Sequence, residues 1–277
     1  MAKQAVVVKE DTAVQQVPDF MKGDAGMGRE SIDPSMLTTP RISLMHPTST
    51  PVVDGLTQSG QWWHSLLQQG LGSEITVTPI FIEKGFTLWN PSRSEGGVLA
   101  RGVQRNGVWV WEPNHTKFDV ELDPKTKQRA VWDTKGSIKE SGLADWGKDN
   151  SPPIAKESIN ILVAVHDAGP EVFGIVSFSK RALPVGRKLV QAIHAKAGVP
   201  LFGLKYTLSS VTATSSSGDR HLAPKWVPAG MVDDPAFYNH CKVMYDRVKS
   251  IGLGLASQEE DNGGAGNEPA GEIKVSF

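Results

Sequence analysis

The chain has little cysteine and no long apolar segment. Its single cysteine, Cys241, excludes an internal disulfide and every zinc site built from several cysteines, and it fits a reducing compartment. No apolar run approaches the roughly 20 residues that cross a bilayer. The opening MAKQAVVVKEDTAVQQ lacks the apolar stretch and cleavage site of a secretory signal. We therefore expect a cytoplasmic protein with no membrane partner.

The motifs of common enzyme classes are also missing. There is no phosphate-binding G-x-x-x-x-G-K-[ST], no H-E-x-x-H, no G-x-S-x-G and no C-x-x-C. Ser177 and Lys180 match S-x-x-K only formally, because Ser177 ends a predicted strand and the motif needs a helix. The seven histidines include no pair at helical i, i+4 spacing. We predict a non-enzymatic protein with no catalytic residues, no cofactor and no bound metal.

Charge is distributed unevenly along the chain, although the formal net charge is only -1. Residues 39–252 hold 24 basic and 19 acidic residues and stand at +5, whereas 1–38 stand at -2 and 253–277 at -4. This asymmetry is typical of a body that binds polyanions beside a tail that competes with them, although +5 is also ordinary for a large domain. We predict a flexible arm over 1–38, one folded domain over 39–252 and a disordered acidic tail over 253–277.

Short strands and turns dominate the folded part. The alternation in RISLMH, the β-branched EITVTPIFIEKGFTLWN with a bend at Pro79, and the apolar runs ESINILVAV and FGIVSFSK predict strands. Hairpins are expected over 96–132, one of them at Asn106-Gly107, and a long loop over 133–156. Two amphipathic helices are expected over 181–198 and 234–252. The first has Val185, Leu189 and Ile193 on its apolar face, and the second begins at Asp234 as N-cap and carries Phe237, Cys241, Met244 and Val248 on its apolar face. The fold class is mainly β with α additions (α+β), an OB-like antiparallel barrel of short strands elaborated by hairpins and two late helices.

Aromatic and basic residues interleave in the middle of the chain. Proteins that hold single strands use cations to follow phosphates and flat rings on which bases stack, each stacked base contributing about 1–3 kcal/mol. The predicted nucleic-acid-binding residues are Trp62, Trp89, Arg93, Arg101, Arg105, Trp109, Trp111 and Lys117. These residue types predict sequence-tolerant binding of single-stranded nucleic acid.

The tryptophans of this set, and a second group of basic residues, each have two possible structural roles. In VWVW, Trp109 and Trp111 share one face, and they form either an exposed stacking platform or core packing, with the core favoured for any single tryptophan. In the tandem Trp62-Trp63, at least one ring should be partly exposed. A second basic set is interpreted first as a solvated helix face and otherwise as extra phosphate contact: Lys180, Arg181, Arg187, Lys188 and Lys196.

The C-terminal segment pairs acidic residues with a final aromatic residue. Glu259, Glu260 and Asp261 mimic a polyanion, and Phe277 offers a small docking group for a partner. This arrangement resembles the C-termini of bacterial and phage single-stranded DNA-binding proteins, which recruit replication and repair partners. Lys274 makes the last residues here less acidic than is usual in such tails.

The body carries further strings of the same kind: PRISLMHPTS, GQWWHS, FTLWNPSR followed by GGVLAR, SGLADWG, and KWVP before DDPAFYNHCKVMYDRVK. Over about 40–252 the chain resembles phage-encoded single-stranded DNA-binding proteins. The resemblance implies an OB-type core that coats single-stranded DNA during phage replication or recombination in the host cytoplasm. It also implies that replication or recombination proteins dock on the tail.

Two other functions are weighed against this one. A structural or scaffolding phage protein would use its tryptophans at subunit interfaces, and the sequence leaves homo-oligomerisation open. A metal-dependent nuclease would place Asp119, Glu121 and Asp133 around a divalent ion, although alternating carboxylates in a hairpin usually face solvent.

Overall fold

The computed structural model describes residues 40–91, 97–123, 125–149, 151–168, 172–214, 218, 220–251 and 253. The main sheet has seven antiparallel strands in the order β10-β9-β4-β11-β12, and β5 and β6 extend it from the far end of β4. Its strands are β4 (Glu74–Trp89), β5 (Val98–Arg105), β6 (Val108–Glu112), β9 (Lys156–Val165), β10 (Phe173–Ser179), β11 (Leu204–Thr214) and β12 (Arg220–Met231).

Two smaller sheets and a few helices complete the fold. One small sheet contains β1 (Ile42–Leu44), β2 (Trp62–His64) and β3 (Gln69–Gly72), and the other is the hairpin of β7 (Lys117–Asp123) and β8 (Gln128–Asp133). The helices are α1 (Thr50–Val53), α2 (Ile138–Ser141), α3 (Leu183–His194) and α4 (Pro235–Ile251), with single 3-10 turns η3 (Lys180–Ala182) and η4 (Leu201–Gly203). None of the helices described is both long and apolar enough to cross a membrane.

The predicted class, mainly β with α additions, is confirmed, but the OB-like barrel is not. Among the described strands, the edge strands β10 and β12 do not pair with each other, so the main sheet stays open. The segment expected to bend into two strands at Pro79 is instead the single strand β4, in which a register shift between Pro79 and Phe81 accommodates the proline. A bulge suits this position because proline cannot donate a ladder hydrogen bond.

The two faces of the main sheet are covered by different helices. On one face, here called the α3 face, Ile159, Ile161 and Val163 of β9 pack in one core with Leu189 of α3. On the opposite face, here called the α4 face, Leu162 and Ala164 pack with residues of α4. Successive residues of β9 therefore enter different cores, as expected for a strand covered on both sides.

Both long helices match their predicted apolar faces. Val185, Leu189 and Ile193 of α3 point into the core of the α3 face. The carboxylate of Asp234 accepts a hydrogen bond from the backbone N–H of Ala236 at 2.8 Å and caps the start of α4. Cys241 lies fully buried on the inner face of α4, and burial raises the pKa of its thiol to about 12. The thiol is therefore protonated and serves as a small apolar side chain.

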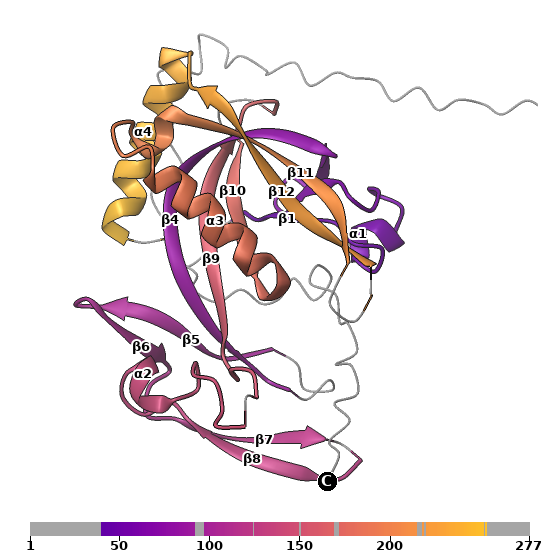
Figure 1. Ribbon diagram of the computed structural model, residues 1–277, viewed down its shortest axis with the longest axis vertical. Coiled ribbons are helices and arrows are strands. Elements are labelled where there is room, and N and C mark those ends of the chain that lie inside the picture. Colours follow the sequence, from indigo (N-terminus) through magenta and orange to yellow (C-terminus); the bar gives the residue numbers. More distant parts are fainter. Residues whose placement is uncertain are drawn as a thin grey trace, which may run out of the picture.

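A separate lobe lies at one end of the long axis, where β5, β6, α2, β7 and β8 gather away from α3 and α4 (Figure 1). We call it the hairpin lobe. Strands β4 and β9 run from the main body into it. Its core is formed by Leu88, Ala100, Trp111, Val120, Trp132, Ile138, Leu143 and Ala155. The loop expected over 133–156 contributes to this core through α2, which begins at a capping box of Ser137 and Glu140.

Candidate nucleic-acid interface

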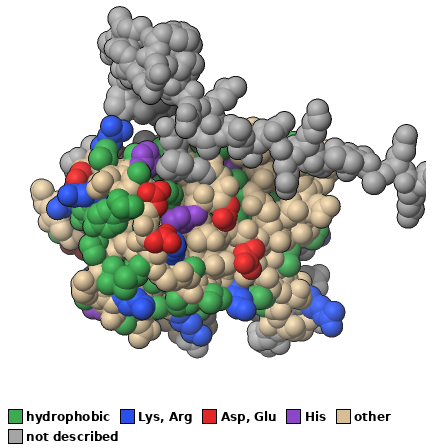
Figure 2. All heavy atoms as spheres, turned by 90° about the horizontal axis from the view of Figure 1, so that it is seen from above, with side chains coloured by type: hydrophobic (Ala, Val, Ile, Leu, Met, Phe, Trp, Pro, Cys, Tyr) green, Lys and Arg blue, Asp and Glu red, His purple; other side chains and the backbone are tan. Residues whose placement is uncertain are grey.

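The end of the molecule opposite the hairpin lobe is an unfavourable place for a polyanion. Figure 2 looks onto this end and shows acidic and histidine side chains gathered beside apolar ones. Asp167 and Asp233 lie here around His166 and Lys205, and Lys205 pairs with Asp233 at 2.9 Å. Desolvation by burial lowers the pKa of His166, so this imidazole adds no positive charge at neutral pH. The junction of the main body and the hairpin lobe is a better candidate for the interface.

A polar row crosses four strands at this junction. Lys156 of β9 lies directly opposite Thr87 of β4, Thr87 lies opposite Arg101 of β5, and Arg101 lies opposite Glu112 of β6. Residues that face each other across antiparallel strands project from the same side of the sheet. The row therefore places Lys156 and Arg101 on the α4 face. Their Cα atoms lie about 10 Å apart, which is two strand spacings.

Trp89 adds an aromatic ring to this row. It lies two residues beyond Thr87 on β4, so it projects from the same face about 7 Å further along the strand. The bulge at this position adds its extra residue to β5 and leaves the alternation of β4 intact, with Leu88 fully buried and Trp89 47% exposed. A base can stack on this exposed indole while the neighbouring phosphates bind the two cations.

Arg101 and Arg105 share this face but differ in their surroundings. Arg101 is half-buried, and desolvation lowers the pKa of its guanidinium. The group stays charged, because the ordinary pKa of arginine is far above neutral pH. Arg105 is exposed and donates to the carboxylate of Glu112 at 2.9 Å. An exposed ion pair of this kind contributes little to stability and can exchange its partner for a phosphate. The register therefore places Trp89, Arg101 and Arg105 on one face of the sheet, with Trp89 and Arg105 on opposite sides of Arg101 along the strand direction.

Trp109 and Trp111 lie on the other face of the same hairpin. Trp111 is opposite Gly102, and Trp109 is opposite Gln104, so both rings point to the α3 face, away from Arg101 and Arg105. Trp111 is 1% exposed, and its indole Nε1–H donates to Ser141 Oγ at 2.8 Å. Of the two alternatives for VWVW, core packing is confirmed for Trp111. The grouping of these two rings with the arginines in one predicted binding set is wrong, because β7, β8 and α2 cover their face of the sheet.

Gly102 leaves space for α2 and Phe86 to pack beside the indole of Trp111. A Cβ atom at Gly102 would lie 2.8 Å from the Cβ of Phe86 and still closer to Ile138 Cδ1. The missing side chain thus leaves room for α2 to approach the sheet beside Trp111. Trp109 lies at the margin of this core, half-buried and edge-on to Phe86 at a ring separation of 5.5 Å. Only part of its ring is accessible for stacking.

The tandem tryptophans of β2 do not expose a ring. Trp62 and Trp63 are 1% and 4% exposed, so the expectation that one of them is partly exposed is wrong. Strand β2 is central in its small sheet, and the ring of Trp62 enters the core of the α3 face. Both faces of this short strand are covered, which the alternation rule alone cannot reveal. Trp62 therefore offers no surface for a base as the protein is folded.

The remaining predicted residues lie elsewhere. Lys117 is exposed on β7, opposite Asp133, and belongs to a different sheet from Arg101. Arg93 and the four tail residues lie outside the residues that the structure describes, as does the arm over 1–38. Glu259, Glu260, Asp261 and Phe277 are those tail residues. Leu253, which the sequence assigned to the tail, is instead buried in the core beneath α4.

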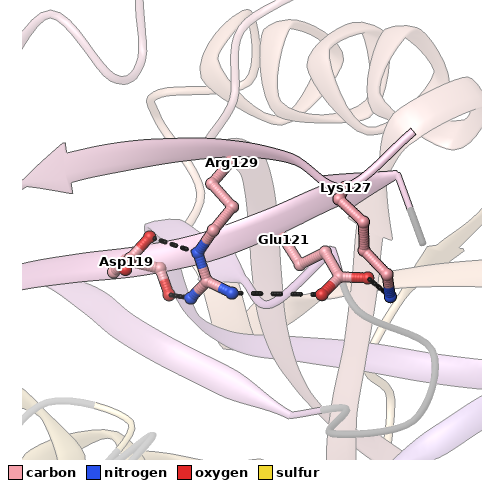
Figure 3. Close-up of polar contacts among 4 residues, drawn as sticks. All are labelled: Asp119, Glu121, Lys127 and Arg129. Carbon is pink, nitrogen blue, oxygen red and sulfur yellow. Dashed lines mark hydrogen bonds and ion pairs between the residues drawn. The ribbon is translucent and has the colours of Figure 1, made fainter. Parts of the chain in front are cut away.

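Two of the three carboxylates of the nuclease alternative, Asp119 and Glu121, are engaged in ion pairs (Figure 3), and that of Asp133 accepts a hydrogen bond from the backbone N–H of Lys135 at 3.0 Å. The guanidinium of Arg129 lies between the carboxylates of Asp119, at 2.9 Å, and Glu121, at 3.9 Å, and Lys127 approaches Glu121 to 3.4 Å. Across the described residues, no three His, Cys, Asp or Glu side chains gather as ligands for a metal ion. This geometry is that of a solvent-facing charge ladder, and it lends no support to the nuclease alternative.

Sequence reasoning missed Thr87 and Lys156. Lys156 follows a loop and carries no motif, and about 70 residues separate it from Thr87 in the chain. Only the antiparallel register of β4 and β9 makes them neighbours. Alternating patterns identify each strand, but they do not give the register between two strands that are distant in sequence.

Comparison with known proteins gives one informative match. The family model for Pam3 phage gp34-like protein matches residues 9–253, which span the whole described fold from β1 to Leu253. No curated protein and no solved structure matches the chain. The protein accordingly belongs to the phage family of Pam3 gp34-like proteins.

Proposed function

We propose that this phage protein binds single-stranded DNA without sequence preference, on the α4 face at the junction of the main body and the hairpin lobe. The observation that carries the proposal is the row Lys156–Thr87–Arg101 with the exposed ring of Trp89 beside it. Cations that follow phosphates and a ring on which a base stacks are the two elements that such proteins combine. The host cytoplasm, where phage DNA is replicated and recombined, is the expected place of action.

Each residue of the row has a distinct task in this proposal. Arg101 and Lys156 hold phosphates on either side of Thr87, whose hydroxyl can donate to a phosphate oxygen. Trp89 supplies the stacking surface, and Arg105 exchanges Glu112 for a phosphate when a strand is bound. Because every base has a π-face and every nucleotide a phosphate, these contacts do not select a sequence.

The acidic tail leaves the fold on this same face. The backbone N–H of Leu253 donates to Glu83 Oε2 at 3.3 Å, and the Leu253 side chain is buried. Glu83 lies four residues before Thr87 on β4, so the tail begins about 13 Å from the row. Acidic residues tethered this close have a high effective concentration at a basic surface. The tail thereby competes with DNA and, once displaced, offers Phe277 and its acids to replication or recombination proteins.

The proposal is tested by titrating the full chain with oligo(dT) while tryptophan fluorescence is recorded at two salt concentrations. We expect quenching of the exposed Trp89 and weaker binding at higher salt, because each neutralised phosphate of a single strand contributes about -0.7 to the slope of log K against log salt. Duplex DNA and RNA are the comparison ligands. Absence of quenching together with assembly into large particles without nucleic acid would favour the scaffolding alternative instead.

Ending the chain at Leu253 is expected to tighten binding of oligo(dT) by about 1.4- to fivefold at low salt. The truncation removes residues with a net charge of -4, and exposed charge interactions of this kind are worth about 0.2–1 kcal/mol. The dissociation constant is measured by fluorescence anisotropy. A matched full-length chain with its tail carboxylates changed to amides should behave like the truncated one. Weaker binding by the truncated chain would contradict competition by the tail.

A further inference from the structure

Two lysines lie close together where β9 begins and β10 ends, beside η3. Ser158 of β9 lies directly opposite Ser179 of β10, and both project from the α4 face. Lys156 lies two residues before Ser158 and shares its face, and Lys180 follows Ser179 as the first residue of η3. Lys180 lies near enough to Lys156 for its charge to lower the pKa of Lys156, so the two lysines and the two serines gather where these strands meet η3.

These ammonium groups lack the carboxylate partners that surface lysines often have. Within the described part of the chain, no carboxylate oxygen lies within 4 Å of either lysine, and the Nζ of Lys156 donates to the carbonyl of Pro153 at 2.9 Å. Glu157 is on the opposite face, where it pairs with Lys84 at 3.3 Å and Arg187 at 2.9 Å. Burial and the nearby charge of Lys180 lower the pKa of Lys156. Among the described residues, this pair of lysines thus has no carboxylate partner.

The backbone of Lys180 is held in an unusual conformation. Its φ of +48° lies in the left-handed region. For any residue that has a side chain, this conformation raises the free energy of the folded state. The other non-glycine residues with positive φ in the described chain lie in turns and loops: Gln68, Asn106, His115 and Lys127. Ser179, next to Lys180, uses its hydroxyl for no helix-capping hydrogen bond. Glycine would adopt this backbone conformation at a lower free energy, so the Lys180 side chain can be removed by a change to glycine without adding backbone strain.

We infer that Lys156 and Lys180, with the hydroxyls of Ser158 and Ser179, form a phosphate subsite that takes one phosphodiester of the bound strand. The inference rests on the proposed function and extends the contact surface from Thr87 toward η3. Two ammonium groups supply the charge, and hydroxyl donors supply directed hydrogen bonds to the oxygens of one phosphate. Of the two interpretations of the second basic set, phosphate contact is the one we propose for Lys180, whereas Arg187 already pairs with Glu157.

The test uses Lys180→Gly and Lys156→Gln in the full chain. Lys180→Gly removes the ammonium and relieves the left-handed backbone, so we expect an unchanged or higher melting temperature together with weaker binding of oligo(dT). Each variant should reduce the slope of log K against log salt by about 0.7. The matched control is Lys127→Gly, which removes another lysine of positive φ on the β7–β8 hairpin, away from this face, and should leave the slope unchanged.

A second readout separates this inference from the proposed function. Pyrophosphate is titrated into protein with isotopically labelled lysine methylene groups, and the resonances of Lys156 and Lys180 should shift together and be lost in the variants. Binding of oligo(dT) with an unreduced slope in both variants would overturn the subsite and leave the proposed function standing. A protein that fails to bind oligo(dT) but still shows both pyrophosphate shifts would overturn the proposed function and keep the anion subsite. Absence of both responses would overturn both.

Discussion

Trp89→Ala is expected to weaken binding of oligo(dT) roughly 5- to 150-fold, because replacing an aromatic stacking residue by alanine costs about 1–3 kcal/mol per base. Trp89 projects from the face that holds Arg101 and Lys156, and almost half of its surface is accessible. Its loss removes the stacking surface and leaves the cations in place. The salt dependence should therefore stay close to that of the unmodified chain while the affinity falls. Anisotropy of a labelled oligonucleotide at fixed salt measures both quantities.

The control for this variant is Trp146→Ala. Trp146 is 68% exposed but lies in the loop after α2, outside the row of Lys156, Thr87 and Arg101. Its replacement should leave affinity unchanged, and both variants should keep their stability because neither ring is buried. Equal losses in the two variants, or no loss in Trp89→Ala, would show that the binding face has been assigned wrongly.

Trp111→Ala is expected to lower the free energy of unfolding by about 3–5 kcal/mol, the usual cost of truncating a buried Phe or Trp. The ring is enclosed in the core of the hairpin lobe and donates its N–H to Ser141 Oγ at 2.8 Å. Truncation leaves a cavity beside Gly102 and removes the donor that Ser141 Oγ accepts from. Urea denaturation followed by far-UV circular dichroism measures the change.

Val108→Ala is the matched control on the same strand. Val108 projects from the opposite face of β6 and is exposed, so its truncation should change stability by no more than about 0.5 kcal/mol. Trp111→Phe separates packing from binding. This variant should be less stable than the unmodified chain yet bind oligo(dT) equally well while folded. A loss of affinity without a loss of stability would return Trp111 to the binding surface.

These outcomes would show that tryptophans close together in sequence serve different ends. Trp109 and Trp111 project from β6 into the core of the hairpin lobe, whereas Trp89 of β4 projects from the opposite face of the sheet, which also carries Arg101 and Arg105. A stretch rich in aromatic and basic residues therefore divides into a packing set and a contact set. Alternation along each strand sorts residues into two sets, but it does not say which set is covered.

Local features of this protein followed from its sequence alone. Asn106 and Gly107, with φ of +50° and +79°, form the turn that Asn-Gly predicts, and Asp234 caps α4 where expected. The apolar faces of α3 and α4 were also predicted, because a 3.6-residue period is fixed by the helix itself. In each case the controlling interactions lie within a few residues along the chain.

Tertiary structure decided the composition of the candidate interface. The position of Lys156 beside Thr87 depends on the register between β4 and β9, and the burial of Trp111 depends on where α2 and the β7–β8 hairpin pack. It also decided that β4 runs unbroken past Pro79 and that the described sheets stay open. Register and face selection are set by which apolar surfaces meet when distant segments pack, and no local pattern in the chain encodes that choice.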